Sequence, residues 1–402
     1  MARVLLVGAG RHQRRVIHRA HELGIEVVAV DRNPEAPGLA EADVGEAVDF
    51  LDVDAVVQVG RRHGVEGVVT FAADRAVPIV AAVAEELGLP GIGREAAHLA
   101  THKVAQRRRF AETGVPQPQF AAARDLHEAR VALETVGAPA VLKPADSSGQ
   151  RQIFVLRGID DLEAHLHASL AESPTGEAII ESYAEGREVN TLFAIRDGTP
   201  TLVTLSDRLR PEGIGFGVAK AHRFPSTLFG YALEEAERVA RFSIHALGLS
   251  TGIAYPQLLV TDAGEASIVE IAARIPGGQM ADVALLGAGV DLVEISLRQA
   301  LDQPIPDELV QPKFTQPLAI FFLTAEPGPL PTGTVRSFSG LDRVLSFPGV
   351  VQADLFLTEG ETIRPVQRDG DRRGYVIAEG ATNIEALERA EAAASLLDVE
   401  VE

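Results

Sequence analysis

The 402-residue sequence contains no cysteine, and this absence excludes disulfide bonds, thiolate metal sites and cysteine nucleophiles. Long apolar runs are also missing: the stretch from Ala76 to Ala84 is far shorter than the roughly 20 residues that a membrane-spanning helix needs. Met1 to Val7 run into a glycine turn and lack the apolar core and cleavage site of a secretory signal. We therefore expect a cytoplasmic protein that has no membrane partner.

Basic residues are outnumbered, with 37 lysines and arginines against 57 aspartates and glutamates and a formal charge of −20. This balance repels a phosphate backbone, so nucleic acid is not expected as a general partner. Two local clusters are basic although the chain as a whole is acidic, and we interpret both as solvated helix faces. They are Arg11, His12, Arg14, Arg15 and Arg19 on the first predicted helix, and Arg107 to Arg109.

Lysine is rarer still, because almost all of the basic residues are arginine. It occurs only at Lys103, Lys143, Lys220 and Lys313. Where arginine supplies the general surface charge, a lysine is a candidate for a position that needs a compact ammonium group. These positions are therefore the first to consider for chemistry.

The N-terminal region alternates short apolar runs with helical stretches, which predicts an α/β arrangement of parallel strands and crossover helices. The predicted segments are strands at Val4 to Val7, Glu26 to Val30 and Val65 to Phe71, a helix ending at Leu23, and a helix from Val77 to Leu87. Gly8-Ala9-Gly10 ends the first strand and Asp31 ends the second, which is part of a dinucleotide-binding fingerprint. Because Gln13 replaces the third glycine, we favour a structural turn or a substrate-facing edge over a nucleotide site.

The pattern changes between Leu89 and Pro118, where proline and glycine flank a helix that carries Lys103, and this predicts a domain junction. Short β-type segments beyond it predict a mostly antiparallel sheet. The predicted strands are 140–143, 153–156, 178–181, 188–195, 201–206, 252–260 and 266–272, and the predicted helices are 160–171 and 233–247. From Thr315 onward a third, strand-rich region ends in an alanine-rich helix from Ile384 to Leu397.

Two segments of the second region have features of a nucleotide site. Lys143 ends an apolar strand just before Ser147-Ser148-Gly149-Gln150, which offers one fixed cation and backbone amides that can converge on phosphate oxygens. Glu181-Ser182-Tyr183-Ala184 follows another apolar strand and precedes Glu188, an arrangement that can meet adenine and ribose. A surface lysine beside a polar turn and a plain hairpin are the respective alternatives.

A third segment places charge in an apolar setting. Glu270 lies in the strand Ile268 to Ala272, and Arg274 follows it just before Pro276-Gly277-Gly278. A carboxylate in that setting needs a partner, which either a hard metal ion or the arginine can supply. The segment from Ser206 to His222 is polar and glycine-rich over 213–217, and we place it either near a substrate or in a mobile polar loop.

The order and separation of these segments resemble the ATP-grasp superfamily, of the carboxylate-amine ligase type, over essentially the whole chain. The resemblance implies a Rossmann-like N-terminal domain at 1–95, an ATP-grasp α+β domain at 96–314 and a C-terminal lid-like domain at 315–402, where Asp371 to Ala378 resemble the lid of biotin-carboxylase-like and amino-acid-ligase-like members. It implies ATP binding by Lys103, Lys143, Ser147, Ser148, Gly149, Gln150, Glu181, Tyr183, Ala184 and Glu188, magnesium binding by Glu270 and Gln257, catalysis by Arg274 and Lys143, and substrate binding by Arg208, Lys220, His222, Arg274, Gly277 and Gly278.

The implied reaction transfers the ATP γ-phosphoryl group to a small carboxylate and passes the acyl group to an amine, with amino acids as candidate substrates and a homodimer as the expected assembly. Gln257 stands where the family usually has a metal-binding glutamate, and Ala272 where it usually has an asparagine, so tight binding of two magnesium ions is not expected. Three alternatives remain: a biotin-carboxylase-like enzyme that phosphorylates bicarbonate, a nucleotide-binding protein without turnover, and a nicotinamide-dependent oxidoreductase that uses Gly8, Gly10 and Asp31.

Overall fold

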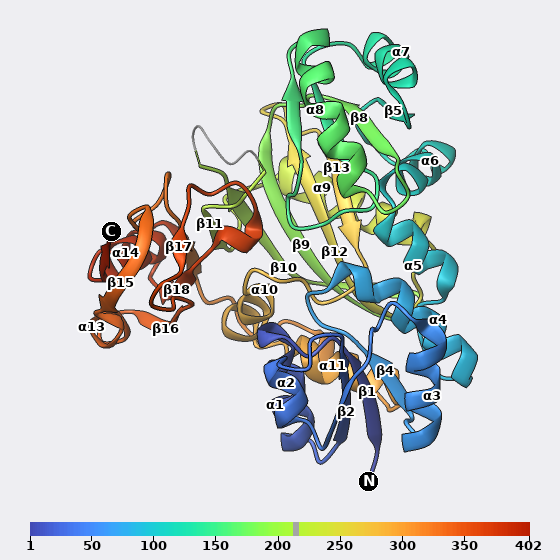
Figure 1. The fold of residues 1–402 in the computed structure, drawn as a ribbon, viewed down its shortest axis with the longest axis vertical. Helices are drawn as coiled ribbons and strands as arrows, with labels where there is room; N and C mark the ends of the chain where they lie inside the picture. The colour runs from blue at the N-terminus through green and yellow to red at the C-terminus, as the bar shows by residue number, and fades with distance from the viewer. Residues whose placement is uncertain (212–216) are drawn as a thin grey trace.

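The computed structural model describes residues 1–211 and 217–402, and it begins with a parallel four-stranded sheet in the order β3-β2-β1-β4 (Figure 1). The elements of this part are β1 (Arg3–Val7), η1 (Arg11–Gln13), α1 (Arg14–Glu22), β2 (Glu26–Asp31), α2 (Pro37–Glu41), β3 (Val44–Ala47), α3 (Val53–His63), β4 (Gly67–Val69), η2 (Asp74–Ala76) and α4 (Val77–Leu87). The predicted α/β arrangement is confirmed. β3 escaped prediction because this edge strand alternates half-buried and exposed residues and has no apolar run.

The strands predicted as one antiparallel sheet after the junction belong to two sheets, which corrects that expectation. The first, in the order β5-β8-β6-β7, is small and antiparallel, and its core packs against α7 and α8. This part comprises α5 (Arg94–Thr101), α6 (Lys103–Thr113), β5 (Phe120–Ala123), α7 (Leu126–Val136), β6 (Ala140–Pro144), β7 (Phe154–Leu156), α8 (Ile159–Glu172) and β8 (Ala178–Ser182).

The second sheet has eight strands in the order β13-β12-β9-β10-β11-β14-β18-β16. They are β9 (Arg187–Arg196), β10 (Thr199–Leu209), β11 (Ala221–Phe224), β12 (Gly252–Val260), β13 (Ala266–Ala272), β14 (Leu318–Phe322), β16 (Val350–Leu355) and β18 (Gly374–Glu379). The long helix α9 (Tyr231–Ala246) packs against β12 and β13. Because β14 pairs with β11, the sheet continues across the predicted boundary at 314/315.

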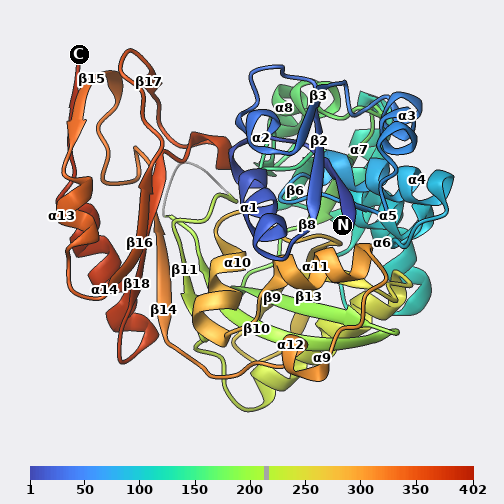
Figure 2. The ribbon, with the colours of Figure 1, turned by 90° about the horizontal axis from the view of Figure 1, so that it is seen from below.

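Four elements follow β13: α10 (Met280–Asp282), the π-helix η3 (Val283–Gly287), α11 (Leu292–Ala300) and α12 (Asp307–Val310). The C-terminal part lies beside the N-terminal part in Figure 2, and its remaining elements are β15 (Gly333–Ser339), α13 (Leu341–Leu345), β17 (Thr362–Ile363), η4 (Asp369–Asp371), α14 (Asn383–Ala394) and β19 (Asp398–Val401). Within the described ranges, no helix is long and apolar enough to span a bilayer.

The basic residues of α1 form ion pairs within the chain, which revises the interpretation of a freely solvated face. Arg19 pairs with Asp291 and Glu294 around the start of α11, and Arg15 pairs with the buried Asp282. α1 and α11 pack together, and one apolar core joins the N-terminal sheet to the eight-stranded sheet. The N-terminal part is therefore fixed against the strands that carry the candidate site.

Candidate functional site

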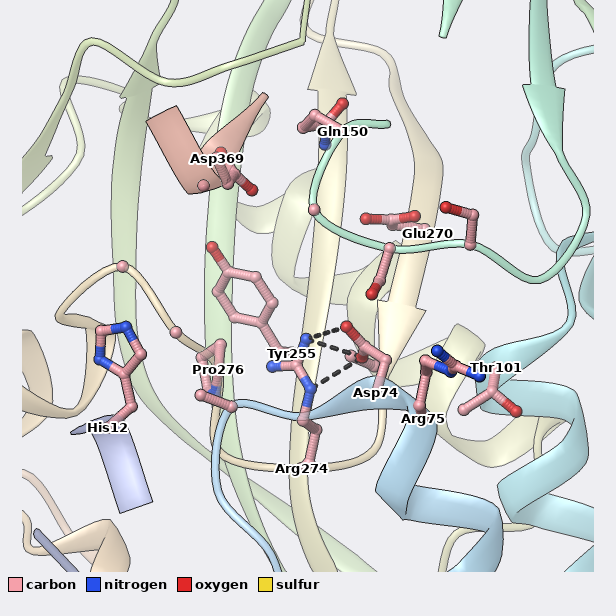
Figure 3. A pocket seen from close by; sticks show the side chains of 18 of the residues that line it. His12, Asp74, Arg75, Thr101, Gln150, Tyr255, Glu270, Arg274, Pro276 and Asp369 are labelled. Atoms are coloured by element: carbon pink, nitrogen blue, oxygen red, sulfur yellow. Dashed lines mark hydrogen bonds and ion pairs between the residues drawn. The ribbon is translucent and has the colours of Figure 1, made fainter. Parts of the chain in front are cut away.

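A cavity of about 950 Å³ lies where the three parts of the chain meet (Figure 3). Its walls combine residues from about 11 to 375, so no single part of the chain forms it alone. The charged and aromatic residues that line it include Arg11, His12, Asp74, Arg75, Lys103, Arg208, His222, Tyr255, Glu270, Arg274, Phe356, Asp369 and Arg372. Such a mixture of convergent polar groups in one large cavity is typical of a binding site for small molecules.

Lys103 and the predicted phosphate loop form one wall. Lys103 is the first residue of α6, and its Nζ donates to the Ser147 carbonyl at 2.6 Å. Ser147, Ser148, Gly149 and Gln150 all line the cavity. Gly149 has a φ of +71°, and the space around its missing side chain is open, so a ligand can approach this backbone closely. The structure therefore brings Lys103 and the loop together as predicted.

Lys143 and Glu181 lie outside the residues that line this cavity, in a buried ion cluster with Arg107. The Glu181 carboxylate accepts from Lys143 Nζ at 2.7 Å and from Arg107 Nε at 2.7 Å. Burial alone would raise the pKa of Glu181, but the charges of Arg107 and Lys143 lower it to about 2. Since Arg107 is 1% exposed, the expected solvated face at 107–109 is wrong for this residue. Tyr183 and Ala184 also lie outside the cavity lining.

Glu270 and Gln257 face each other across two paired strands and both line the cavity. The backbone on either side of Glu270 is clamped by α6: Arg107 donates to the carbonyls of Ile268 and Val269, and Gln106 bonds to both backbone groups of Ile271. One carboxylate and one amide offer the oxygen ligands that magnesium prefers. Among the described residues, no group of three or more histidines, aspartates or glutamates could hold a metal ion.

Arg274 lies just beyond β13 and forms a two-pronged ion pair with Asp74 at the start of η2 (Figure 3). Arg274 Nε and Nη2 each donate to an Asp74 carboxylate oxygen at 2.7 Å. Burial would raise the pKa of Asp74, but Arg274 and then Lys103 lower it, so this carboxylate stays charged. Asp74 comes from the N-terminal part, which the sequence analysis did not connect with this site.

The predicted substrate residues divide into two groups. Arg208, His222, Gly277 and Gly278 line the cavity, whereas Lys220 does not line it and instead pairs with Glu391 of α14 at 2.8 Å. His222 Nδ1 lies 3.1 Å from the Asn190 amide nitrogen. Burial, together with the nearby Arg208 and Arg372, places the pKa of His222 well below its usual value, so the ring is neutral at pH 7.

Glu188, predicted to meet ribose, also lies outside the cavity lining. It pairs with Arg208 and, at 3.0 Å, with Arg210. Residues 213–216 of the glycine-rich stretch, together with 212, lie outside the part of the chain that the structure describes.

Sequence reasoning missed many of the cavity residues, among them Asp74, Tyr255 and Arg372. Arg372 stacks on the Phe322 ring, with the guanidinium carbon 3.8 Å from the ring centroid. Its burial lowers its pKa, and Arg208 adds to that effect. The Arg372-Arg373-Gly374 stretch was available as a signal, because two successive arginines in an otherwise strand-like segment need an anionic or aromatic partner.

The glycine turn after β1 is closed by its own neighbours. Asp31 accepts from the Ala9 backbone amide at 2.8 Å, and the Gln13 side chain packs beside Gly8 and donates to the Phe71 carbonyl. These contacts use the groups that a dinucleotide would need. They favour the structural turn over the nucleotide site.

Two family models match the chain, an ATP-grasp N-terminal domain over residues 17–91 and the L-amino acid ligase C-terminal domain 2 over residues 328–402. Among curated proteins, the chain is 28% identical over 407 residues to a formate-dependent phosphoribosylglycinamide formyltransferase of Ignicoccus hospitalis, covering 99% of this chain and 96% of the relative. A protein of the same name from Burkholderia thailandensis is 29% identical over 404 residues, covering 98% of this chain and 94% of the relative.

Solved structures extend the likeness to the whole fold. An L-amino acid ligase from Bacillus licheniformis superposes with a TM-score of 0.84 at 19% identity, covering 100% of this chain and 99% of that chain. A phosphoribosylglycinamide synthetase from Anaerococcus prevotii has a TM-score of 0.77 at 19% identity and covers 100% of both chains. The fold, the two terminal domain models and the relatives agree: the chain has the ATP-grasp fold and is similar over its whole length to ATP-dependent ligases and transferases of that superfamily.

Proposed function

We propose that this chain transfers the γ-phosphoryl group of ATP to a small carboxylate, giving an acyl phosphate and ADP. An amine then attacks the acyl carbon, an amide or peptide bond forms, and phosphate leaves. One observation carries the proposal: a single cavity of about 950 Å³ is lined by Lys103, the 147–150 loop, Glu270 and Arg274.

The residues present suit this chemistry because phosphoryl transfer needs positioning and charge neutralisation rather than a protein nucleophile. We assign the ATP phosphates to Lys103 and the backbone of the 147–150 loop, and the oxyanion of the carboxylate or acyl phosphate to Arg274, because all of them line one cavity. Lys143 precedes the 147–150 loop in the chain, and we assign to its ammonium group, which is paired with Glu181, a further positive charge for the nucleotide. Three parts of the chain surround the cavity, and closure around bound ATP would exclude water, which otherwise hydrolyses an acyl phosphate.

The oxygen donors of this site suit magnesium, but the protein offers few of them. Glu270 and Gln257 would hold it through one carboxylate and one amide oxygen, and ATP phosphates and water would complete its shell. Bound there, magnesium would neutralise charge on the phosphates. Because Glu270 and Gln257 together supply only one negative charge, we expect the metal to bind chiefly together with the nucleotide.

The substrate side of the cavity favours a small polar acid and amine. Arg208 and Arg372 supply positive charge, and the neutral His222 supplies a hydrogen-bonding group without adding charge. The relatives' names include formate-dependent transferases and an L-amino acid ligase, so formate and amino acids are the substrates to test first. The homodimer stays a prediction.

The test is ADP release in a screen of formate and amino acids, supplied singly and in pairs. The proposal expects release that requires both an acid and an amine, and a hydroxamate product when hydroxylamine replaces the amine. Release that depends on bicarbonate and biotin would support the carboxylase alternative. Tight ATP binding with no release under any condition would support the nucleotide-binding alternative and contradict the proposal.

A further inference from the structure

The ion pair between Asp74 and Arg274 joins two distant parts of the chain at the centre of the cavity. Both residues line the cavity, and their side chains are 24% and 12% exposed respectively. The two 2.7 Å contacts use both carboxylate oxygens. A guanidinium held at two points in one plane has a fixed orientation, whereas a single contact would let it rotate.

The backbone just before Asp74 is also held in place by hydrogen bonds. The Ala72 amide donates to the Ile275 carbonyl at 3.1 Å, so the loop after β4 is bonded to the residue next to Arg274. Ala72 has a φ of +55°, a conformation that a non-glycine residue adopts only when its surroundings impose it. The Gln13 side chain holds the neighbouring Phe71 carbonyl. The backbone before Asp74 is therefore held from two sides, by Gln13 of the N-terminal part and by the segment that carries Arg274.

Counting hydrogen-bond donors shows what this pair leaves available. A guanidinium has five N–H groups. Asp74 takes one from Nε and one from Nη2, and the Ile275 carbonyl takes one from Nη1 at 3.3 Å. Two N–H groups remain, one on each terminal nitrogen, and two such neighbouring donors form a second fork that matches the two oxygens of a carboxylate or phosphate.

We propose that Asp74 is a positioning residue for Arg274: it occupies one fork of the guanidinium so that the other fork points at the substrate oxyanion. This inference rests on the proposed function, in which Arg274 binds the carboxylate or acyl phosphate. Asp74 acts through Arg274 and does not itself touch the reacting atoms. The N-terminal part thereby contributes to phosphoryl transfer through its ion pair with Arg274.

The direction in which phosphate affinity changes when Asp74 is replaced separates a positioning role from a simple effect of charge. Removing a negative charge near an anion site should tighten anion binding, because like charges repel. Removing a positioning residue should weaken it instead, and loss of a residue that orients a ligand typically costs about 10- to 100-fold in affinity or activity. The probe is inorganic phosphate, titrated calorimetrically with and without Mg-ADP.

The proteins compared are wild type, Asp74→Asn, Arg274→Ala, the double variant, and Glu85→Gln as a control. Glu85 lies on α4, which directly follows η2, and pairs with Arg94 on the surface, so its variant should bind phosphate like wild type. We expect Asp74→Asn to bind phosphate at least about tenfold more weakly. The double variant should bind no more weakly than Arg274→Ala, because Asp74 acts through that arginine.

Phosphate affinity that is unchanged or tighter in Asp74→Asn would overturn the proposal, and so would a wild-type protein that binds no phosphate. Thermal unfolding of each variant checks that the fold is kept. Ligase activity is measured separately. If wild type shows no acid- and amine-dependent ADP release but the variants show the expected phosphate affinities, the proposed function is wrong and the positioning role of Asp74 is still supported.

Discussion

Lys143, Glu181 and Arg107 form a buried cluster whose charges do not cancel. Two cations share one carboxylate, so +2 and −1 leave a net charge of +1. Buried charge without a counterion is costly, which favours an anion nearby. In the proposed function a nucleotide phosphate would supply that anion, so the pair with Glu181 leaves Lys143 able to attract ATP.

Replacing Lys143 by alanine should lower the turnover rate by about a hundred- to thousandfold, because one aimed charge is lost. The fold should survive, since Glu181 keeps its contact with Arg107. The measurement is ADP release at saturating ATP. Lys313→Ala is the matched control, because Lys313 is an exposed lysine away from the cavity and its loss should change nothing. Near wild-type turnover in folded Lys143→Ala would contradict the assignment.

The pKa of Glu181 predicts acid sensitivity. Folding lowers it from 4.5 to about 2. The stability from the charged carboxylate is thus fully present above about pH 4.5 and is lost as the pH falls through about 2, an effect on the order of 3 kcal/mol. Urea unfolding between pH 6 and 3 should give a shallower pH dependence for Glu181→Gln than for wild type. Equal slopes would mean that Glu181 is not charged in the folded protein.

Gln257 and Glu270 predict an unusual magnesium response. Gln257→Glu restores an anionic oxygen and should lower the magnesium concentration for half-maximal ADP release, whereas Glu270→Gln should raise it steeply or abolish activity. Both changes are nearly isosteric, so charge is the variable tested. A magnesium titration at saturating ATP gives the midpoints. If Gln257→Glu has the same magnesium midpoint as wild type and Glu270→Gln remains fully active, neither residue binds the metal.

At the scale of elements, α6 links the phosphate wall to the strand that carries Glu270. Lys103 begins the helix, and one turn later Gln106 bonds to the backbone amide and carbonyl of Ile271 on β13. β13 is the edge strand of its sheet, so the Gln106 amide takes the place of a further strand at this point.

Gln106→Leu should therefore lower stability by about 1–3 kcal/mol, because buried backbone groups lose their partners. It should also raise the magnesium midpoint, since Ile271 adjoins Glu270. Gln299→Leu serves as the control: Gln299 donates to the Ile195 carbonyl at 2.6 Å and does not line the cavity. That variant should lose stability without shifting the magnesium midpoint. A shift of equal size in both variants would argue against a specific link through α6.

Sequence patterns predicted the elements well where periodicity was strong. β12 and β13 begin and end at the predicted residues, 252–260 and 266–272. The division into two sheets was not predicted, because strand periodicity reports which residues face a core and does not report which strand is the neighbour. For the same reason, the pairing of β11 with β14, which continues the sheet, could not be predicted from the sequence.

At the scale of the whole molecule, the site could be predicted only where its residues lie in motifs. Lys103, Glu270 and Arg274 belong to recognisable segments and do line the cavity. Asp74 begins a helix in the Rossmann-like part and has no local signal, because its role comes from a partner 200 residues away. Lys220 is the opposite case. It was predicted to bind substrate because lysine is rare and the segment is polar, but its side chain pairs with Glu391.

Mg-ATP should stabilise the protein, because its predicted contacts come from several elements of the folded chain. At a hundredfold excess over the dissociation constant, one site contributes about 2.7 kcal/mol. Thermal unfolding with millimolar Mg-ATP should show this shift, and NADH should show none, since Asp31 and Gln13 already fill the glycine turn. A shift with NADH alone would revive the oxidoreductase alternative.

The backbone amide of Asp369 donates to the Gly149 carbonyl at 3.1 Å, and the cavity wall is completed only by residues such as Arg372. This contact bears on biosynthesis. A ribosome that has translated the first 314 residues has already made Lys103, Lys143, the phosphate loop, Glu270 and Arg274, yet the strands that close the cavity have not been synthesised. Under the proposed function, the growing chain carries these residues before the segments that complete the cavity wall have been made, so the cavity forms only late in synthesis.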